Sequence, residues 1–248
     1  MITVKSESDL KKMRVACTIA SETFKMIESY VVPGVSTKEL DERIEEFIRS
    51  KGATPSFKHL YGFPASACIS IDDVVVHGIP SPRKLREGEI VSIDLGACYS
   101  GFHSDAARTF AVGEISEEKR RLIEVTKQSF FEGLKHLRAG KRLGDASYAI
   151  QQYVESNGFS VVRAMTGHGI GRRVHEDPNV PNYGTPNTGV VLKAGYTLAV
   201  EPMVNSGTYK VFIDSADKWT CRTLDGKASA HYENTVLITS GEPEILTL

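Results

Sequence analysis

Two aspartates, Asp94 and Asp105, have a type and spacing that indicate chemistry. Residues 91–95 alternate apolar and polar side chains as a β-strand does, and residues 99–101 are typical of a turn. A chain reversal there places the two carboxylates nearly opposite each other, unless a bulge at Gly101 shifts the register by one residue. Facing carboxylates repel, and in apolar surroundings one would take up a proton unless a cation lay between them. The stretch therefore predicts a cation site, with two exposed hairpin aspartates as the alternative.

The elements that would position these side chains are helix pairs and short strands. Apolar residues that recur at three- and four-residue steps predict four helices, each bounded by polar capping residues or by Gly and Pro. The helices are expected from Ser8 to before Pro33, from Ser36 to Gly52, from Ser116 to about Leu137 and from about Gly144 to Ser156. Extended segments are expected at 67–71, at 74–77, from Ile90 onward and from Ser160 to the last residues.

The second half of the chain repeats the landmarks of the first. Gly34 and Gly140 each precede a helix and lie 106 residues apart, and segment 85–94 matches segment 192–201 at an offset of 107. We therefore predict an α+β fold in which a pseudo-two-fold duplication of a helix-helix-strands unit closes around one curved antiparallel sheet. The predicted ranges are 1–248 for a single domain and about 8–112 and 116–240 for its two copies.

The duplication predicts one cleft that contains four carboxylates. Glu201 occupies the position of Asp94 in the second copy, and equivalent strands of a pseudo-symmetric fold face each other, so both acids should point inward beside Asp105. The extended run 230–237 adds Glu233. Ion pairs with Lys or Arg are one way to neutralise such a cluster, but neither strand has an inward-facing cation nearby. Two divalent cations about 3.5–4 Å apart would neutralise all four acids.

Three histidines are expected around this cleft. The segment that begins at His77 recurs as the segment that begins at His168, each reading His-Gly-Ile, and His175 follows on a loop. An isolated histidine is more often structural than a ligand, but a glycine beside each repeated imidazole would leave room for a metal or a substrate. Four carboxylates and one imidazole form a hard ligand set, which favours Mn, Fe or Co over metals that prefer thiolates.

Composition narrows the possible partners. A net charge of −1 gives no electrostatic reason to expect a nucleic acid or a membrane as partner. The first residues are charged and no run of about 18 apolar residues occurs, so we expect a cytoplasmic protein. The cysteines show no CxxC spacing, which predicts reduced thiols rather than disulfides or a thiolate zinc site.

Seven motifs, taken together and in order, resemble those of the type I methionine aminopeptidases. They lie at 76–80 (VHGIP), 92–96 (SIDLG), 104–108 (SDAAR), 167–171 (GHGIG), 175–178 (HEDP), 199–203 (AVEPM) and 231–235 (HYENT). The resemblance extends from about Ser8 to the last residues and implies the pita-bread fold, which agrees with the duplication.

The resemblance implies a single catalytic domain that hydrolytically removes the N-terminal, initiator methionine from nascent polypeptides and prefers a small second residue. The implied ligands of two divalent ions (Co, Mn or Fe, with Zn as an alternative) are Asp94, Asp105, His168, Glu201 and Glu233. A water that bridges the ions would lose a proton and attack the carbonyl after the first residue, with Glu201 as the proton carrier. His175 would donate to the carbonyl oxygen, and His77 would hold the scissile amide nitrogen. The substrate's free amine would bind one metal, which explains an exopeptidase.

The resemblance also implies an apolar pocket for the methionine side chain. Phe63, Cys68 and Trp219 match the pocket positions of the family, with ordinary packing as the alternative for Trp219. Val174 and Leu60 depart from the larger or aromatic residues frequent at their positions, which leaves the shape of the pocket open.

The implied partners and the competing families complete the prediction. Partners would be the N-termini of nascent chains, with transient ribosome association, for a cytoplasmic monomer that binds no specific nucleic acid and no membrane. Asn234 stands where a histidine is common beside Glu233, a change expected to act around the ligands.

Prolidases and aminopeptidase P carry an additional N-terminal domain, whereas one predicted helix precedes Pro33 here. A non-enzymatic relative would have lost ligands. Type II enzymes carry a large insertion in the second half, for which the roughly sixteen extra residues near His175 are too few.

Overall fold

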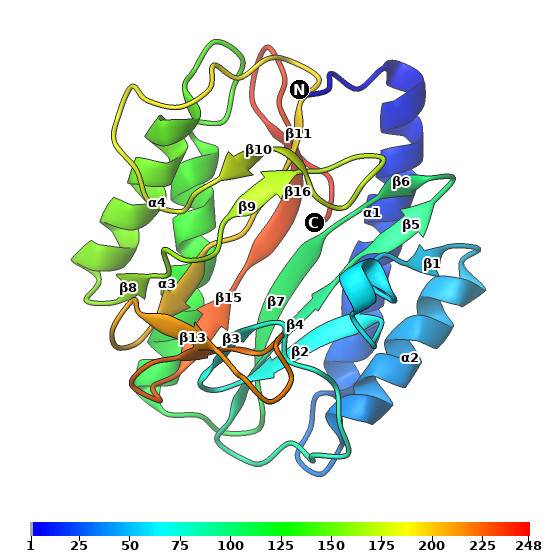
Figure 1. The fold of residues 1–248 in the computed structure, drawn as a ribbon, viewed down its shortest axis with the longest axis vertical. Helices are drawn as coiled ribbons and strands as arrows, with labels where there is room; N and C mark the ends of the chain where they lie inside the picture. The colour runs from blue at the N-terminus through cyan, green and yellow to red at the C-terminus, as the bar shows by residue number, and fades with distance from the viewer. Residues whose placement is uncertain (1) are drawn as a thin grey trace.

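An eight-stranded antiparallel sheet forms the centre of the structure, a computed structural model that describes residues 2–248 (Figure 1). Its strands in spatial order are β10 (Glu176–Val180), β9 (Gly167–Gly169), β11 (Thr197–Val200), β16 (Glu233–Leu237), β7 (Ala106–Ala111), β4 (Ile90–Leu95) and β2 (Ala67–Ile71), with β17 (Glu244–Ile245) paired to β16. Three small sheets surround it: β1 (Thr54–Pro55), β5 (Ala97–Tyr99) and β6 (Phe102–His103); β15 (Ser229–His231), β12 (Met203–Asn205) and β8 (Ser160–Val161); β13 (Val211–Ile213), β14 (Cys221–Thr223) and β3 (Val74–Val76).

Three of the four long helices begin directly after a serine N-cap, and the fourth begins after Arg142. The four are α1 (Glu7–Ile27), α2 (Thr37–Ser50), α3 (Glu117–Leu134) and α4 (Leu143–Ser156), with short 3-10 turns at Glu28–Tyr30 and Leu60–Gly62. Helix α1 begins after Ser6 rather than at Ser8, because the Ser6 hydroxyl accepts a hydrogen bond from the Asp9 amide and the Asp9 carboxylate accepts one from the Ser6 amide. None of the described helices is long and apolar enough to cross a membrane.

Each helix pair covers one half of the sheet. Helices α1 and α2 pack on β2 and β4, where Leu40 and Ile44 join a buried cluster with Ile93. Helices α3 and α4 pack on β11 and β16, where Ile150 and Val236 belong to a second buried cluster. In Figure 1, α3 and α4 lie at the left and α1 and α2 at the right, with the central strands between them. The helix-facing surface of the sheet is therefore apolar, and polar strand residues point to the other face.

The register of the β4–β7 hairpin differs from the prediction. Asp94 pairs with Ala107, not with Asp105. The reason lies in the turn: Ser100 and Gly101 both have positive φ (49° and 76°), as the two central residues of a type I′ turn require, so the reversal is centred on them rather than on Tyr99. Asp105 therefore lies one diagonal step from Asp94 on the same face of the sheet.

Equivalent hydrogen bonds in the two halves support the predicted duplication. The amide of Gly34 donates to the Leu85 carbonyl at 2.8 Å, and the amide of Gly140 donates to the Leu192 carbonyl at 2.9 Å. The strand order is also symmetric about the junction between β16 and β7, with β11 in the place of β4. The duplication within one domain stays a prediction, with these correspondences in its favour.

Removal of the Leu40 side chain should destabilise the protein, because this side chain is fully buried between α2 and the sheet. We expect Leu40→Ala to lower the free energy of unfolding by about 2–5 kcal/mol in urea titrations. The matched control is Glu46→Ala on the exposed surface of the same helix, which should stay within about 0.5 kcal/mol of wild type. Equal losses in both variants would contradict the assigned core.

Candidate metal centre and active site

Strand pairing places four residues in one row across the sheet. Cys68 on β2 is opposite Asp94 on β4, Asp94 is opposite Ala107 on β7, and Ala107 is opposite Glu233 on β16. Adjacent strands lie about 4.8 Å apart, so one strand bearing only a methyl group separates the two carboxylates. The row continues on β11, because Val200 is opposite Asn234 and the next residue, Glu201, therefore lies beside Glu233.

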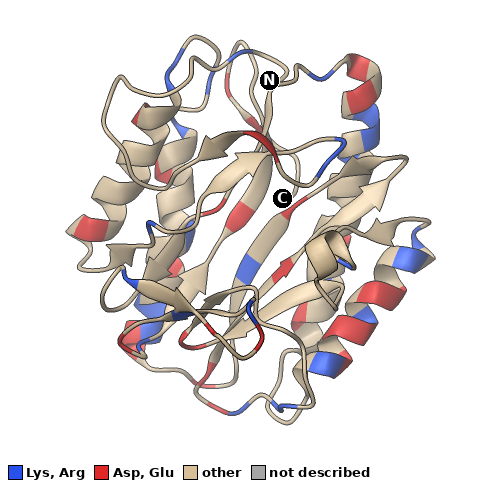
Figure 2. Cartoon of the chain, viewed as in Figure 1, with Lys and Arg blue, Asp and Glu red and all other residues tan. Residues whose placement is uncertain are grey.

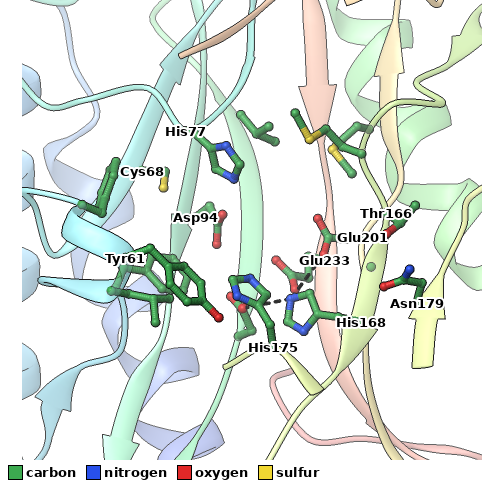
Figure 3. A pocket seen from close by; sticks show the side chains of 18 of the residues that line it. Tyr61, Cys68, His77, Asp94, Thr166, His168, His175, Asn179, Glu201 and Glu233 are labelled. Atoms are coloured by element: carbon green, nitrogen blue, oxygen red, sulfur yellow. Dashed lines mark ion pairs between the residues drawn. The ribbon is translucent and has the colours of Figure 1, made fainter. Parts of the chain in front are cut away.

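The remaining predicted ligands join this row from neighbouring positions. His168 on β9 is opposite Ala199 on β11, which lies two residues before Glu201. Asp105 precedes β7, and its backbone is held by Thr235, whose hydroxyl accepts from the Asp105 amide at 3.0 Å and donates to its carbonyl at 2.8 Å. Figure 3 shows Asp94, Glu201, Glu233 and His168 converging on one space. The structure thus brings together all five residues that the sequence predicts as ligands.

His168 presents a lone pair to the acids. Its Nδ1 lies 2.9 Å from the carbonyl oxygen of Gly169, which can only accept, so Nδ1 carries the proton in the neutral ring. Its Nε2 lies 3.6 Å from Oδ2 of Asp105 and 3.5 Å from Oε1 of Glu201. Burial, with help from His175, lowers the pKa of His168 to about 4, which keeps the ring neutral. A lone pair that faces carboxylate oxygens is repulsive unless a cation lies between them.

The four acids also require positive charge nearby if they are to be ionised. Burial is the largest cause that raises the pKa of Asp94, Asp105, Glu201 and Glu233, and mutual repulsion adds to it for Asp105, Glu201 and Glu233. Figure 2 shows acidic positions within the central sheet as well as on the helix surfaces. Among residues 2–248, histidines are the ion-pair partners of Asp105, Glu201 and Glu233. One carboxylate oxygen each of Asp94, Asp105 and Glu233 is buried without a hydrogen-bond partner in the described chain.

These observations fit a site for divalent cations. Ligand atoms of Asp105, His168 and Glu233 lie within 4.8 Å of one another. The buried oxygens that lack partners are the groups that a hard cation would bind, and bound cations would reverse the pKa shifts of the acids.

Arg108 does not neutralise the cluster directly. Its guanidinium lies on the helix-covered side of the sheet, over the ring of Tyr232 at 4.5 Å. It donates to the main-chain oxygen of Glu233, to Oδ1 of Asn234 at 2.7 Å and to the carbonyl of Thr247 at 2.9 Å. Asn234 therefore faces Arg108 rather than the acids, and it helps to fix the strand that carries Glu233.

Two further histidines stand at the rim of the cluster. His77 follows β3 with φ of 60°, and its ring lies edge-on to Trp219 at 6.3 Å. The ring of His175 lies 4.4 Å from that of His168 (Figure 3). Burial lowers the pKa of both His77 and His175, with a contribution from His175 at His77. Each ring is therefore neutral near pH 7 and offers one donor and one acceptor.

The loop that carries His175 is tied to the N-terminal segment. Nζ of Lys5 lies 2.8 Å from Oε2 of Glu176, and both side chains are almost fully buried, 6% and 8% exposed. The other oxygen of Glu176 accepts from the amide of Arg173 at 3.2 Å. These contacts hold the loop on both sides of His175.

The predicted pocket residues lie together beside this centre. Phe63 and Cys68 are buried in one cluster, and Phe63 meets Trp219 edge to face at 5.2 Å. Leu60 and Val174, the two departures from the family pattern, belong to the same cluster. The cavity, of about 720 Å³, joins this apolar wall to the acids and histidines.

The sequence did not predict several residues of the site. Tyr61 stacks on His175 at 5.7 Å with an interplanar angle of 13°. His231 lies in the motif at 231–235 without a predicted role, and its Nε2 lies 3.7 Å from Oε2 of Glu201. For Thr235 the sequence predicts only a place in a strand. No spacing rule marks these residues, because each acts through a partner that is distant in sequence.

The glycines beside His77 and His168 have a different purpose from the one predicted. A Cβ at Gly78 would lie 2.3 Å from the carbonyl oxygen of Ile69, and a Cβ at Gly169 would lie 2.0 Å from that of Asp177. These glycines permit close approach of backbone segments rather than leaving room for a metal.

A cluster of buried acids on one face of a curled antiparallel sheet is the arrangement expected of a metal-dependent hydrolase. The sequence profile of metallopeptidase family M24 matches residues 11–240, and the chain belongs to this family. The methionine aminopeptidase of Clostridium perfringens is 58% identical over 100% of this chain and 99% of its own length. A crystal structure of methionine aminopeptidase from Rickettsia prowazekii has a TM-score of 0.98 at 42% identity, with 100% of both chains covered.

These comparisons confirm the resemblance to methionine aminopeptidases, the pita-bread fold and the hydrolase class predicted from the motifs. Prolidase from Pyrococcus furiosus shares the fold, with a TM-score of 0.81 at 23% identity, but this chain covers only 65% of it.

Asp105→Asn should have opposite effects on the metal-free protein and on metal binding. Removal of one of four mutually repelling charges should raise the melting temperature of the chelated protein, by about 2–4 °C for each kcal/mol relieved. The same change should weaken Mn²⁺ binding in calorimetric titrations. The control is Glu46→Gln on the exposed surface of α2, which should change neither quantity. A variant that binds Mn²⁺ as tightly as wild type would remove Asp105 from the ligand set.

Proposed function

We propose that this chain removes the N-terminal methionine from newly made polypeptides whose second residue is small, in a reaction that depends on two divalent cations. The proposed ligands are Asp94, Asp105, His168, Glu201 and Glu233. One observation carries the proposal: uncompensated carboxylates and a neutral imidazole meet at one end of a cavity whose other wall is apolar. The methionine aminopeptidases to which the chain is similar are named for this activity.

The protein's own residues can perform the remaining steps. Bound divalent cations, with Co, Mn or Fe favoured by the ligand set and Zn as an alternative, supply positive charge and lower the pKa of a water molecule to near neutrality. Glu201 takes the proton of the attacking water and delivers it to the leaving amide nitrogen. Neutral His175 donates a hydrogen bond to the carbonyl oxygen as negative charge develops there. His77 holds the scissile nitrogen.

Selection of methionine falls to the apolar wall. Phe63, Cys68 and Trp219 would enclose an unbranched thioether side chain, which favours contact with aromatic rings. The half-buried Trp219 also contacts His77, so the pocket and the scissile bond share one boundary. A second residue larger than Ala or Ser would meet the stacked side chains of Tyr61 and His175.

The setting follows from the substrate. Nascent chains expose their N-termini at the ribosome, so we place the protein in the cytoplasm as a monomer that associates transiently with ribosomes, without a specific nucleic-acid or membrane partner. The near-zero net charge agrees with this view.

Removal of metal should abolish activity. After exhaustive chelation, the release of methionine from a Met-Ala-Ser peptide, followed by amino-acid analysis, should stop, because the acids then lack the cation that activates water. Addition of Mn²⁺, Co²⁺ or Fe²⁺ should restore it. Unchanged turnover after chelation would exclude the metal-dependent reaction.

An Ala-Pro peptide is the control for substrate class in the same assay. It should be a poor substrate at every metal concentration. Preferential cleavage of Ala-Pro would instead indicate a proline-specific peptidase.

His175→Ala should slow the chemical step without loss of metal. Loss of one hydrogen-bond donor to a developing oxyanion typically lowers kcat by about 10²–10³-fold. Metal content, measured by elemental analysis, should equal that of wild type, since His175 lies on an exposed loop outside the proposed ligand set. His136→Ala, at an exposed position after α3, is the matched control and should leave kcat unchanged. Loss of metal from His175→Ala would show that this residue is a ligand instead.

A further inference from the structure

His231 is a buried histidine whose ring has no hydrogen-bond partner in the described chain. The residue ends β15 and is 1% exposed. Neither Nδ1 nor Nε2 forms a hydrogen bond among residues 2–248. Buried polar groups are nearly always hydrogen-bonded, so two such atoms in one ring require an explanation.

The backbone of His231 is fixed by the strand that follows Asp105. The Thr109 hydroxyl on β7 accepts from the His231 amide at 2.9 Å and donates to the His231 carbonyl at 2.9 Å. The same hydroxyl lies 2.8 Å from that of Ser92, two residues before Asp94 on β4. The position of the ring is thus set by the two strands that also position the proposed aspartate ligands.

The ring faces one side of the acid cluster. Its Nε2 lies 3.7 Å from Oε2 of Glu201 and 3.9 Å from Oε2 of Glu233. His168, in contrast, approaches the other oxygen of Glu201, Oε1, at 3.5 Å. The carboxylate of Glu201 therefore lies between two imidazoles, each next to a different oxygen.

We propose that His231 is a positioning residue of the metal centre, which donates a hydrogen bond from Nε2 to Oε2 of Glu201 and so directs Oε1 toward the ions. This inference rests on the proposed metal site. A shortening of the 3.7 Å separation by about 0.5–0.8 Å makes the bond. Carboxylates that bind metals are usually held in this way by a second hydrogen bond, and loss of that partner typically costs about 10–100-fold in metal affinity.

Three substitutions separate this role from simple packing. His231→Gln keeps an amide N–H at a reach similar to that of Nε2. His231→Leu fills the space without a donor, and His231→Asn is polar but too short to place a donor there. The measurement is the dissociation constant of Mn²⁺ by calorimetry on chelated protein, with the melting temperature of the metal-free form as the readout of folding.

We expect His231→Leu and His231→Asn to bind Mn²⁺ about 10–100-fold more weakly than wild type, and His231→Gln to stay near the wild-type constant. Should His231→Leu fail to fold, the comparison of Asn with Gln decides the question. Wild-type affinity in His231→Asn, or equal weakening in Asn and Gln, would overturn the inference while leaving the metal site intact. Absence of Mn²⁺ binding in wild type would instead refute the metal site, and this inference with it.

Discussion

Four carboxylates held close together in a largely buried cavity are the constraint on which the rest of the structure depends. Their repulsion cannot relax by chain movement, because strand pairing fixes Asp94 and Glu233 to either side of Ala107. Arg108, on β7 beside Ala107, donates to main-chain and amide oxygens on the opposite face. Like charges at these positions lower the stability of the metal-free fold, and divalent cations between them would relieve the repulsion without protonation of the acids.

One face of the sheet stabilises the fold, and the other face carries the proposed binding site. Apolar strand residues such as Ile93 and Val236 pack under the helix pairs and provide the stability that the acid cluster removes. Polar residues on the cavity face are held in place by neighbouring side chains. Thr235 hydrogen-bonds to the backbone of Asp105, and Lys5 forms an ion pair with Glu176. Rigid support of this kind is what preorganised ligands and hydrogen-bond donors require.

Much of this could be predicted from the sequence, for reasons that particular residues illustrate. The alternation of apolar and polar residues up to Asp94, and the matching segment that ends at Glu201, predicted which side chains share a face of the sheet. Such alternation is a property of the local sequence. The hairpin register could not be read, because it depends on positive φ at both Ser100 and Gly101. The role of His231 was also missed, since it arises from contacts with strands whose pairing is set by the whole fold.

The hydrogen bonds between Asp105 and Thr235 join residues 130 positions apart, at the middle of the sheet. A growing chain can form the first helix pair and its strands early, but β7 has no neighbour on its β16 side until residue 237 has been made. Such distant pairings close late and slowly in folding. The order of synthesis therefore delays assembly of the complete acid cluster until Glu233 has been made.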